Sequence, residues 1–198
     1  MNKKAAMFGL DARIALAIFG ALSVISGAAL YSAIQSSKIT AFYTQSQEIT
    51  KAVEQYYFDH GEMLPRASSV LRDARYLVTD IASDKNWNGP YIGCEEGSTS
   101  ATYKYIHCKG YDGQDISTYV RTYADTTSFT GACTATDCDL WLFYHIASSK
   151  KSMYETIFDA MDKQYDNSTG RDTGNLKLYV DGGTVWLFMK MMPFENQL

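Results

Sequence analysis

The stretch that decides the fold is residues 7–35, MFGLDARIALAIFGALSVISGAALYSAIQ. No charged residue occurs between positions 14 and 37. As an α-helix this segment is roughly 36 Å long, which is enough to cross a bilayer hydrocarbon core of about 30 Å. Lys3, Lys4 and Arg13 precede the segment, and basic residues remain on the cytoplasmic side of a span. The sequence therefore predicts a membrane-spanning helix whose N-terminus is cytoplasmic and whose following chain is outside.

The helical pattern continues beyond the apolar segment. No helix-breaking residue stands between Ser36 and Tyr57. Apolar residues recur at helical spacing in this part, at Phe42, Ile49, Val53, Tyr56 and Tyr57. We therefore predict one helix of about 50 residues, roughly 75 Å long, that is apolar all round in its first half and apolar along one stripe in its second half.

A removable secretory signal is the alternative interpretation of this N-terminal segment. It would consist of the basic residues, the apolar core 14–25 and the small-residue string SGAA around Ala28. Cleavage there would release a secreted enzyme or binding protein. The uninterrupted helical pattern after Ala28 favours retention of the segment.

Composition argues against several classes of function. With 198 residues, of which 46% are hydrophobic and 20% charged, the chain has room for one globular domain and one extended element. The net charge is −4 and no run of Lys or Arg exceeds a pair, so no nucleic-acid partner is expected. His60, His107 and His145 lack metal-ligand spacing, and no nucleophile motif or phosphate loop occurs, so we expect no enzyme activity.

Four cysteines lie in the second half of the chain and allow three pairings. Behind an export-type N-terminus, an even number of cysteines indicates disulfides, with a zinc site as the alternative. The segments CEEGSTSATYKYIHC and CTATDC each resemble a closed local loop. We therefore favour pairing of Cys94 with Cys108 and of Cys133 with Cys138.

The globular half shows mainly strand patterns. The segment 68–84 fits a short helix or a turn-rich connector packed on the stalk. The helix predicted within 149–166 has one apolar face, made by Met153, Ile157, Phe158 and Met161. Strands are predicted within 102–108, 117–124 and 140–146, and a hairpin within 175–191 turns at Asp-Gly-Gly. The expected fold class is α+β, with the second half of a long N-terminal helix packed on an antiparallel sheet.

Four segments, in this order, carry a resemblance to a known family. The leader MNKKAAMFG ends in glycine directly before the apolar helix, and KAVEQYYFDHGEMLP takes the helix into a tyrosine-rich turn before Pro65. Next come DKNWNGPYI and the acidic segment MDKQYDNSTGRDTGNLKLY. The chain thereby resembles type IV pilins and type II secretion pseudopilins. The family signature Trp-x-Gly-Pro-Tyr corresponds here to Trp87, Gly89, Pro90 and Tyr91.

The resemblance implies an organisation and a function. Residues 1–9 would be a leader, cleaved between Gly9 and Leu10 by a prepilin peptidase. Residues 10–37 would form the transmembrane and filament-core half of the helix, 38–60 its amphipathic half, and 61–198 an extracellular globular domain. Before assembly the protein would reside in the bacterial inner membrane. The inner-membrane assembly machinery would then add it to copies of itself in a cell-surface or periplasmic filament.

Candidate assembly residues lie early in the helix. Pilins usually carry glutamate at the fifth position of the mature chain, where this sequence has Ile14, and Asp11 is the only acid before Glu48. The resemblance implies that Asp11 could neutralise the amine that leader cleavage creates on Leu10 of a neighbouring subunit. Arg13 lies nearby and adds a second positive charge. Small residues at Gly20, Ser23 and Gly27 allow close helix contact. Alternatively, Asp11 and Arg13 are ordinary interfacial residues, and the small residues reflect ordinary membrane composition.

Three further hypotheses stay open at the level of sequence. Trp87 either fills the junction of stalk and sheet or offers a binding platform. Resembling pseudopilins hold calcium in an acidic loop, which makes Asp166 and Asp172 weak candidate ligands, and an acidic, solvated loop is the favoured alternative. The alternative function is a permanently anchored single-span protein with a periplasmic binding domain.

Overall fold

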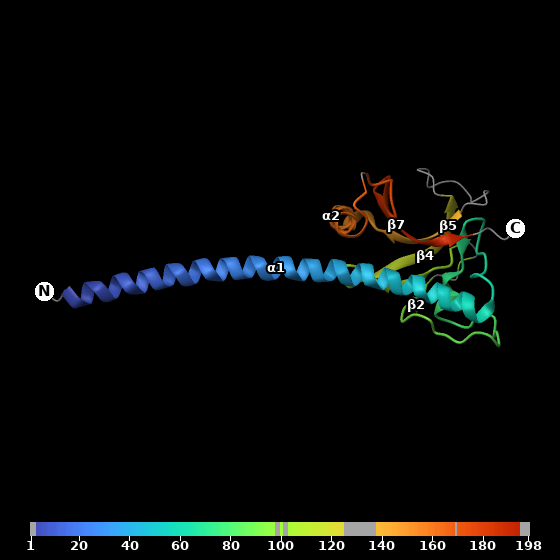
Figure 1. The fold of residues 1–198 in the computed structure, drawn as a ribbon, viewed down its shortest axis with the longest axis horizontal. Helices are drawn as coiled ribbons and strands as arrows, with labels where there is room; N and C mark the ends of the chain where they lie inside the picture. Colours follow the sequence, from blue (N-terminus) through green and yellow to red (C-terminus); the bar gives the residue numbers. More distant parts are fainter. Residues whose placement is uncertain (1–2, 98–99, 101–102, 125–137, 169, 195–198) are drawn as a thin grey trace. The chain divides into compact units, whose positions relative to one another are not determined.

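The structure is a computed structural model that describes residues 3–97, 100, 103–124, 138–168 and 170–194. Helix α1, Lys3–His60, is the longest element (Figure 1). Contacts divide the chain into two compact units, Met1–Thr40 and Ala41–Leu198. Residues 41–60 of α1 thus belong to the same unit as the sheet.

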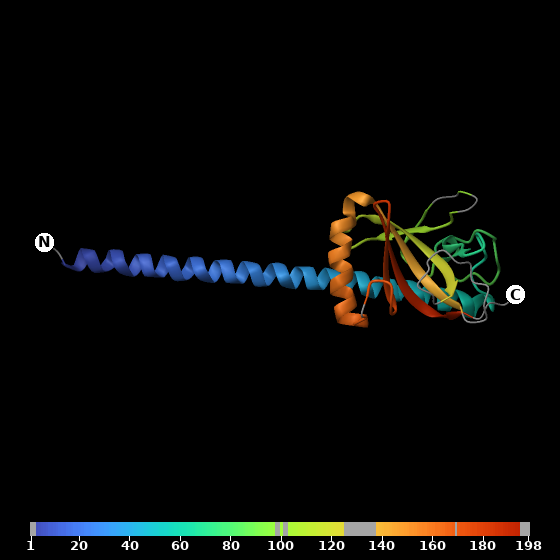
Figure 2. The same cartoon turned by 90° about the horizontal axis from the view of Figure 1, so that it is seen from above.

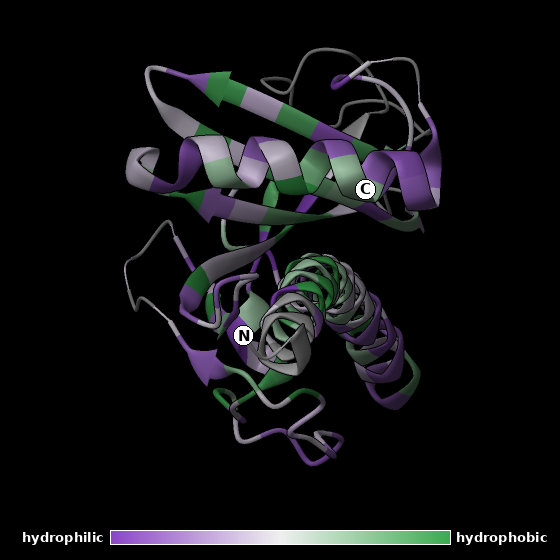
Figure 3. Ribbon diagram, turned by 90° about the vertical axis from the view of Figure 1, so that its left-hand side faces the viewer, coloured by the Kyte–Doolittle hydropathy of each residue, from purple (hydrophilic) through white to green (hydrophobic). Residues whose placement is uncertain are grey.

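The first unit is helical and exposes apolar side chains. Its exposed large residues include Leu16, Phe19, Val24, Leu30 and Tyr31, each more than 60% exposed. Bands of hydrophobic residues along α1 are coloured green in Figure 3. By length and composition α1 is the one described helix that could cross a membrane, and both membrane anchors and signal sequences near an N-terminus have this length and composition. The predicted long apolar helix is confirmed.

Helix α1 buries one stripe of its second half within the globular unit. Ser46 lies in this stripe, together with the apolar residues Phe42, Ile49, Ala52, Val53 and Tyr56. Their spacing of three or four residues places them on one face of the helix. The inclusion of Tyr57 in this stripe was wrong: Tyr57 is 42% exposed although it lies one turn after the buried Val53, and Tyr56 alone continues the buried stripe into the last turn of the helix.

The end of α1 is set by glycine. Gly61 has a φ of +71°, and its N–H donates to the carbonyl of Tyr57 at 2.8 Å. Left-handed backbone is open to glycine without a Cβ clash, so this residue closes the helix.

Among the described residues, the sheet of the second unit has seven strands, all paired antiparallel. Its order is β2-β3-β4-β5-β7-β6, and β1 pairs with β4 outside this path. The views in Figures 1 and 2 show the strands beside the C-terminal end of α1. The bounds are β1 Leu71–Arg72, β2 Glu95–Glu96, β3 Ile106–Lys109, β4 Asp115–Ala124, β5 Cys138–Ile146, β6 Leu176–Asp181 and β7 Thr184–Phe194. The antiparallel α+β architecture and the strands predicted within 117–124 and 140–146 are confirmed, whereas the strand predicted within 102–108 is shorter than expected, since β3 begins at Ile106.

Strand β5 packs against α1 through Tyr144. The ring of Tyr144 lies 5.0 Å from that of Phe42, and its hydroxyl lies 2.7 Å from Ser46 Oγ. Burial raises the pKa of Tyr144, and a buried hydroxyl requires a hydrogen-bond partner. The opposite face of the sheet has its own core, formed by Leu71, Tyr119, Trp141, Phe143 and Phe188.

Helix α2, Lys151–Met161, lies where the sequence predicts a helix, and a π-helical turn, Asp162–Asp166, follows it. Its buried face consists of Tyr154, Ile157, Phe158 and Met161. Met153 from the predicted face is only partly buried. The Tyr154 ring lies 6.2 Å from Phe42, so α1 and α2 meet on the same face of the sheet.

The connector after α1 is turn-rich rather than a regular α-helix. It contains β1 and a 3₁₀ turn, Ala74–Leu77. The turn begins at Asp73, whose side chain accepts from the Arg75 N–H, and the Thr122 N–H donates to the Val70 carbonyl. Pairing with β4 therefore overrides the helical pattern in this segment.

The hairpin of β6 and β7 is confirmed. Gly182 and Gly183 form its turn with φ values of +55° and +95°. Two successive positive φ values suit a two-residue hairpin turn, and glycine adopts them without strain.

Candidate functional site

The Trp-x-Gly-Pro-Tyr segment fastens the end of α1 to the connector. Trp87 Nε1–H donates to the Tyr76 carbonyl at 2.8 Å, and the Tyr91 N–H donates to the Leu77 carbonyl at 2.8 Å. The Tyr91 hydroxyl donates to Asp59 Oδ2 on α1, also at 2.8 Å. These bonds give the motif a structural position between the helix end and the 3₁₀ turn.

Tyr56 lies at the centre of an aromatic group that we call the helix-end cluster: Tyr56, His60, Tyr76, Trp87 and Tyr91. The ring of Tyr56 lies edge-on to Tyr76 at 6.2 Å and to Tyr91 at 5.8 Å, and Trp87 lies edge-on to Tyr91 at 5.9 Å. Burial, followed by neighbouring groups including Asp84, raises the pKa of Tyr56 to about 12. The cluster is thus a partly buried aromatic junction bordered by carboxylates.

Gly89 leaves no space for a side chain in this junction. A Cβ at this position would lie 2.6 Å from Trp87 Cζ2 and 3.0 Å from Tyr91 Cδ2. The glycine of the motif is therefore required by the approach of the Trp87 ring.

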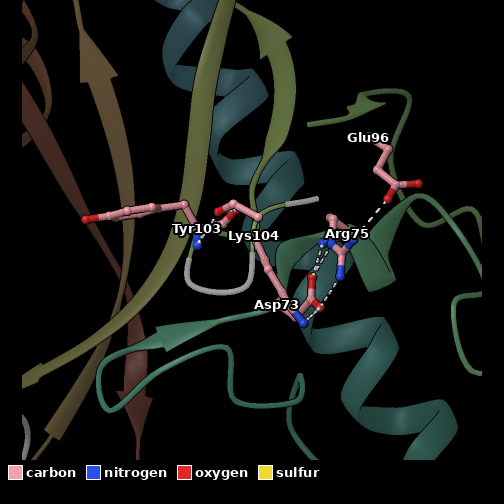
Figure 4. A network of polar contacts seen from close by, with 6 residues as sticks. Asp73, Arg75, Glu96, Tyr103 and Lys104 are labelled. Atoms are coloured by element: carbon pink, nitrogen blue, oxygen red, sulfur yellow. Dashed lines mark hydrogen bonds and ion pairs between the residues drawn. The ribbon is translucent and has the colours of Figure 1, made fainter. Parts of the chain in front are cut away.

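A charged network holds the connector to strand β2 (Figure 4). Arg75 donates to both carboxylate oxygens of Asp73, at 2.9 and 2.8 Å, and reaches Glu96 at 3.2 Å. Lys104 Nζ lies 3.5 Å from Asp73. The hydrogen bond to Asp73 raises the pKa of Arg75. Sequence analysis did not identify this network; the Asp-x-Arg spacing of residues 73 and 75 was its only local signal.

The disulfide between Cys94 and Cys108 confirms the first predicted pair. It connects the residue before β2 to strand β3. The second predicted pair is not tested, because Cys133 lies outside the described residues, whereas Cys138 is buried at the start of β5.

The acidic segment after α2 uses its carboxylates to bind backbone. Asp166 Oδ2 accepts the N–H groups of Asn175 and Leu176 at 2.7 and 2.9 Å, and Oδ1 accepts the Asn175 amide at 3.0 Å. Asp172 is exposed. Within the described part of the chain, no group of three or more His, Cys, Asp or Glu is arranged to hold a metal ion. The calcium hypothesis remains untested, and Asp166 serves as a hydrogen-bond acceptor for the start of β6.

Arg171 connects the acidic segment after α2 to α2 itself. Its guanidinium contacts Asp159 at 2.9 Å and Glu155 at 3.2 Å, both on α2. Its carbonyl accepts the Leu178 N–H of β6. The segment therefore occupies outward backbone groups of β6, the last strand in the sheet order, which would otherwise be open to pairing.

The predicted assembly residues all lie on α1 in the first unit. Asp11, Arg13, Gly20, Ser23 and Gly27 are exposed. A Cβ added at Gly20 or Gly27 meets nothing within 4 Å. The chain by itself therefore does not require glycine at either position. Gly9 and Leu10 lie in the same helix.

A groove of about 360 Å³ lies within the second unit, between α1 and the β6–β7 hairpin. Leu176 and Met189 line it together with the exposed side chains of Lys51 and Glu54. The rings of Tyr43 and Tyr165 are stacked at 3.8 Å and also line the groove. Its lining therefore combines apolar and charged groups.

No protein-family model, curated protein or solved structure matches this chain.

Replacing Gly89 with alanine should destabilise the globular unit by about 1–3 kcal/mol, because the new methyl group must displace the Trp87 ring. Gly93→Ala is the matched control, since nothing lies within 4 Å of a Cβ there. Chemical denaturation of the full chain in detergent micelles measures both. Equal stability of the two variants would show that the close approach at Gly89 is unimportant.

Asp166→Ala should lower the free energy of unfolding by about 1–3 kcal/mol even in the presence of a calcium chelator, because it removes the acceptor of two backbone N–H groups. The exposed Asp172→Ala is the control and should remain within about 0.5 kcal/mol of the parent. Unfolding curves with chelator and with added calcium provide the measurement. A loss of stability seen only with calcium present would assign Asp166 to a metal site instead.

Proposed function

We propose that this protein is a structural subunit of a type IV pilus-like or pseudopilus filament, inserted in the inner membrane before assembly. One observation carries the proposal: α1 is a single helix that exposes apolar side chains in its first half and buries one stripe in its second. The expected pilin fold and the Trp-x-Gly-Pro-Tyr motif are consistent with this role.

The physical basis is that one helix surface suits two environments. An α-helix satisfies its own backbone hydrogen bonds and is therefore stable in lipid. The same apolar surface is equally well covered by other copies of the helix. The globular unit closes its own core and can move with the helix out of the membrane without unfolding. Assembly of this kind requires no catalysis and no cofactor.

Asp11 would balance the amine that leader cleavage creates. Cleavage after Gly9 would leave a positive charge on Leu10, and an unpaired charge in an apolar filament core costs several kcal/mol. Asp11 stands one residue later, in what would be the first turn of the mature helix, where a negative charge also suits the helix dipole. Arg13 adds a second positive charge, which snorkels to the headgroups or pairs with Asp11 of another copy.

The second candidate function is a permanently anchored protein with a periplasmic binding domain. The groove beside Tyr43 and Tyr165 favours it, because a filament subunit does not need a ligand site. Mass spectrometry of the membrane fraction separates the two. A mature chain that begins at Leu10 supports the filament subunit, whereas an intact N-terminus supports the anchored binding protein. A chain that begins near Ala29 would contradict both.

Gly27→Leu should lower filament yield at least about tenfold, equivalent to about 1.4 kcal/mol, without reducing membrane insertion. Because a side chain at this position meets nothing in the isolated chain, any assembly defect must come from contacts with another molecule. Gly27→Ala, which adds a single carbon, should assemble nearly normally. Membrane-bound subunit and sheared filament are quantified together, and normal filament yield from Gly27→Leu would exclude a close contact here.

Asp11→Asn should leave insertion and Gly9 cleavage intact but reduce filament yield at least about tenfold, because it removes charge while retaining size. Glu48→Gln removes a distant exposed acid and serves as the control. Processed subunit in membranes and filament outside the cell are measured for both variants. Normal assembly of processed Asp11→Asn subunits would rule out the charge-balancing role.

A further inference from the structure

His60, the last residue of α1, has a fixed tautomer. Its side chain is only 6% exposed, and its ring stacks on Tyr56 at 4.0 Å. Nδ1 lies 3.0 Å from the Tyr56 carbonyl oxygen. Because a carbonyl oxygen only accepts, Nδ1 must carry the proton. In the neutral ring, Nε2 is therefore the atom with the lone pair.

Nε2 faces a carboxylate that it cannot bond when neutral. It is buried and has no hydrogen-bond partner among the described residues. Asp84 Oδ2 lies 3.6 Å away, beyond hydrogen-bond distance. Two hydrogen-bond acceptors thus face one another, and a hydrogen bond between them requires one proton taken up from solvent.

Several titratable side chains surround this position. The titratable groups of the junction include Tyr56, Asp59 and Glu62 from α1 and the turn after it, Tyr76 from the 3₁₀ turn, and Asp80, Asp84 and Tyr91 from the segment that follows. Four of these are carboxylates. The carbonyl end of a helix also favours a cation.

We propose that His60 is a proton-operated latch between the end of α1 and the segment 84–91. On protonation, Nε2–H donates to Asp84 while Nδ1–H keeps its bond to Tyr56. Asp84 is 41% exposed, so its carboxylate has room to close the remaining distance. Its other oxygen, Oδ1, already accepts the Asn86 N–H, so the new bond connects the helix directly to this segment.

The consequence is a junction that is tighter at acidic pH. At neutral pH the segment 84–91 is held by two hydrogen bonds, from Trp87 to the Tyr76 carbonyl and from the Tyr91 hydroxyl to Asp59. Protonation adds a charge-assisted bond to these two. This inference concerns the globular unit and does not depend on filament assembly.

Hydrogen exchange of the Trp87 and Tyr91 amides, at pH 5.5 and pH 7.5, tests the latch. Both amides donate within the junction, to the carbonyls of Asp84 and Leu77. The full chain is measured in detergent micelles with a chelator, and rates are corrected for intrinsic exchange. We expect local opening to be about fivefold rarer at pH 5.5, the factor that corresponds to about 1 kcal/mol.

Three variants identify the groups responsible. His60→Gln and Asp84→Asn should each abolish the fivefold difference, whereas His145→Gln, which changes an exposed histidine on β5, should retain it. Asp84→Asn retains the His60 ring, so it remains informative if His60→Gln folds poorly. The proposal is overturned if the parent shows no difference between the two pH values, or if Asp84→Asn still shows it.

Discussion

The contact on which the globular unit depends is the burial of one stripe of α1, where Tyr144 of strand β5 meets Phe42 and Ser46. Ile49 and Val53 of this stripe are completely buried, and the Ser46 hydroxyl meets the hydroxyl of the equally buried Tyr144. Apolar burial alone would allow α1 to rotate or slide at small cost, because it has no direction. The buried tyrosine removes this freedom, since an unpaired hydroxyl in the core costs about 1–3 kcal/mol. One polar pair therefore selects the rotation of the helix in an otherwise apolar interface.

That rotation determines what the helix end presents to the rest of the unit. With Tyr56 facing inward, Asp59 is within reach of Tyr91 and His60 is within reach of Asp84. The Trp-x-Gly-Pro-Tyr segment closes over this end and ties it to the 3₁₀ turn through Trp87. A motif that could serve as a ligand platform is thus engaged in internal contacts, which favours the structural interpretation of Trp87 over the binding one.

Charged side chains organise the irregular segments around the sheet. Asp73, Arg75 and Glu96 join the connector to β2, next to the disulfide between Cys94 and Cys108. Asp166 and Arg171 perform the corresponding role beside β6, where they occupy its outward backbone groups. In both places a carboxylate is used to satisfy backbone or guanidinium donors. The surface of this acidic chain is therefore partly structural, and an acidic cluster in its sequence is not by itself a sign of a metal site.

The sequence by itself determined the features that depend on local periodicity and backbone chemistry. The apolar helix, its amphipathic continuation, the long strands, the Gly-Gly hairpin and the Cys94–Cys108 loop could all be predicted, because each signal lies within a short segment. Tertiary structure decided the rest. Residues 71–72 became a strand through pairing with β4, Tyr57 was left outside the buried stripe, and Asp73, Arg75 and Glu96 met across distant segments. His60 faces Asp84 for the same reason. Such contacts join residues far apart in the chain, and only the packing of α1 on the sheet brings their side chains together.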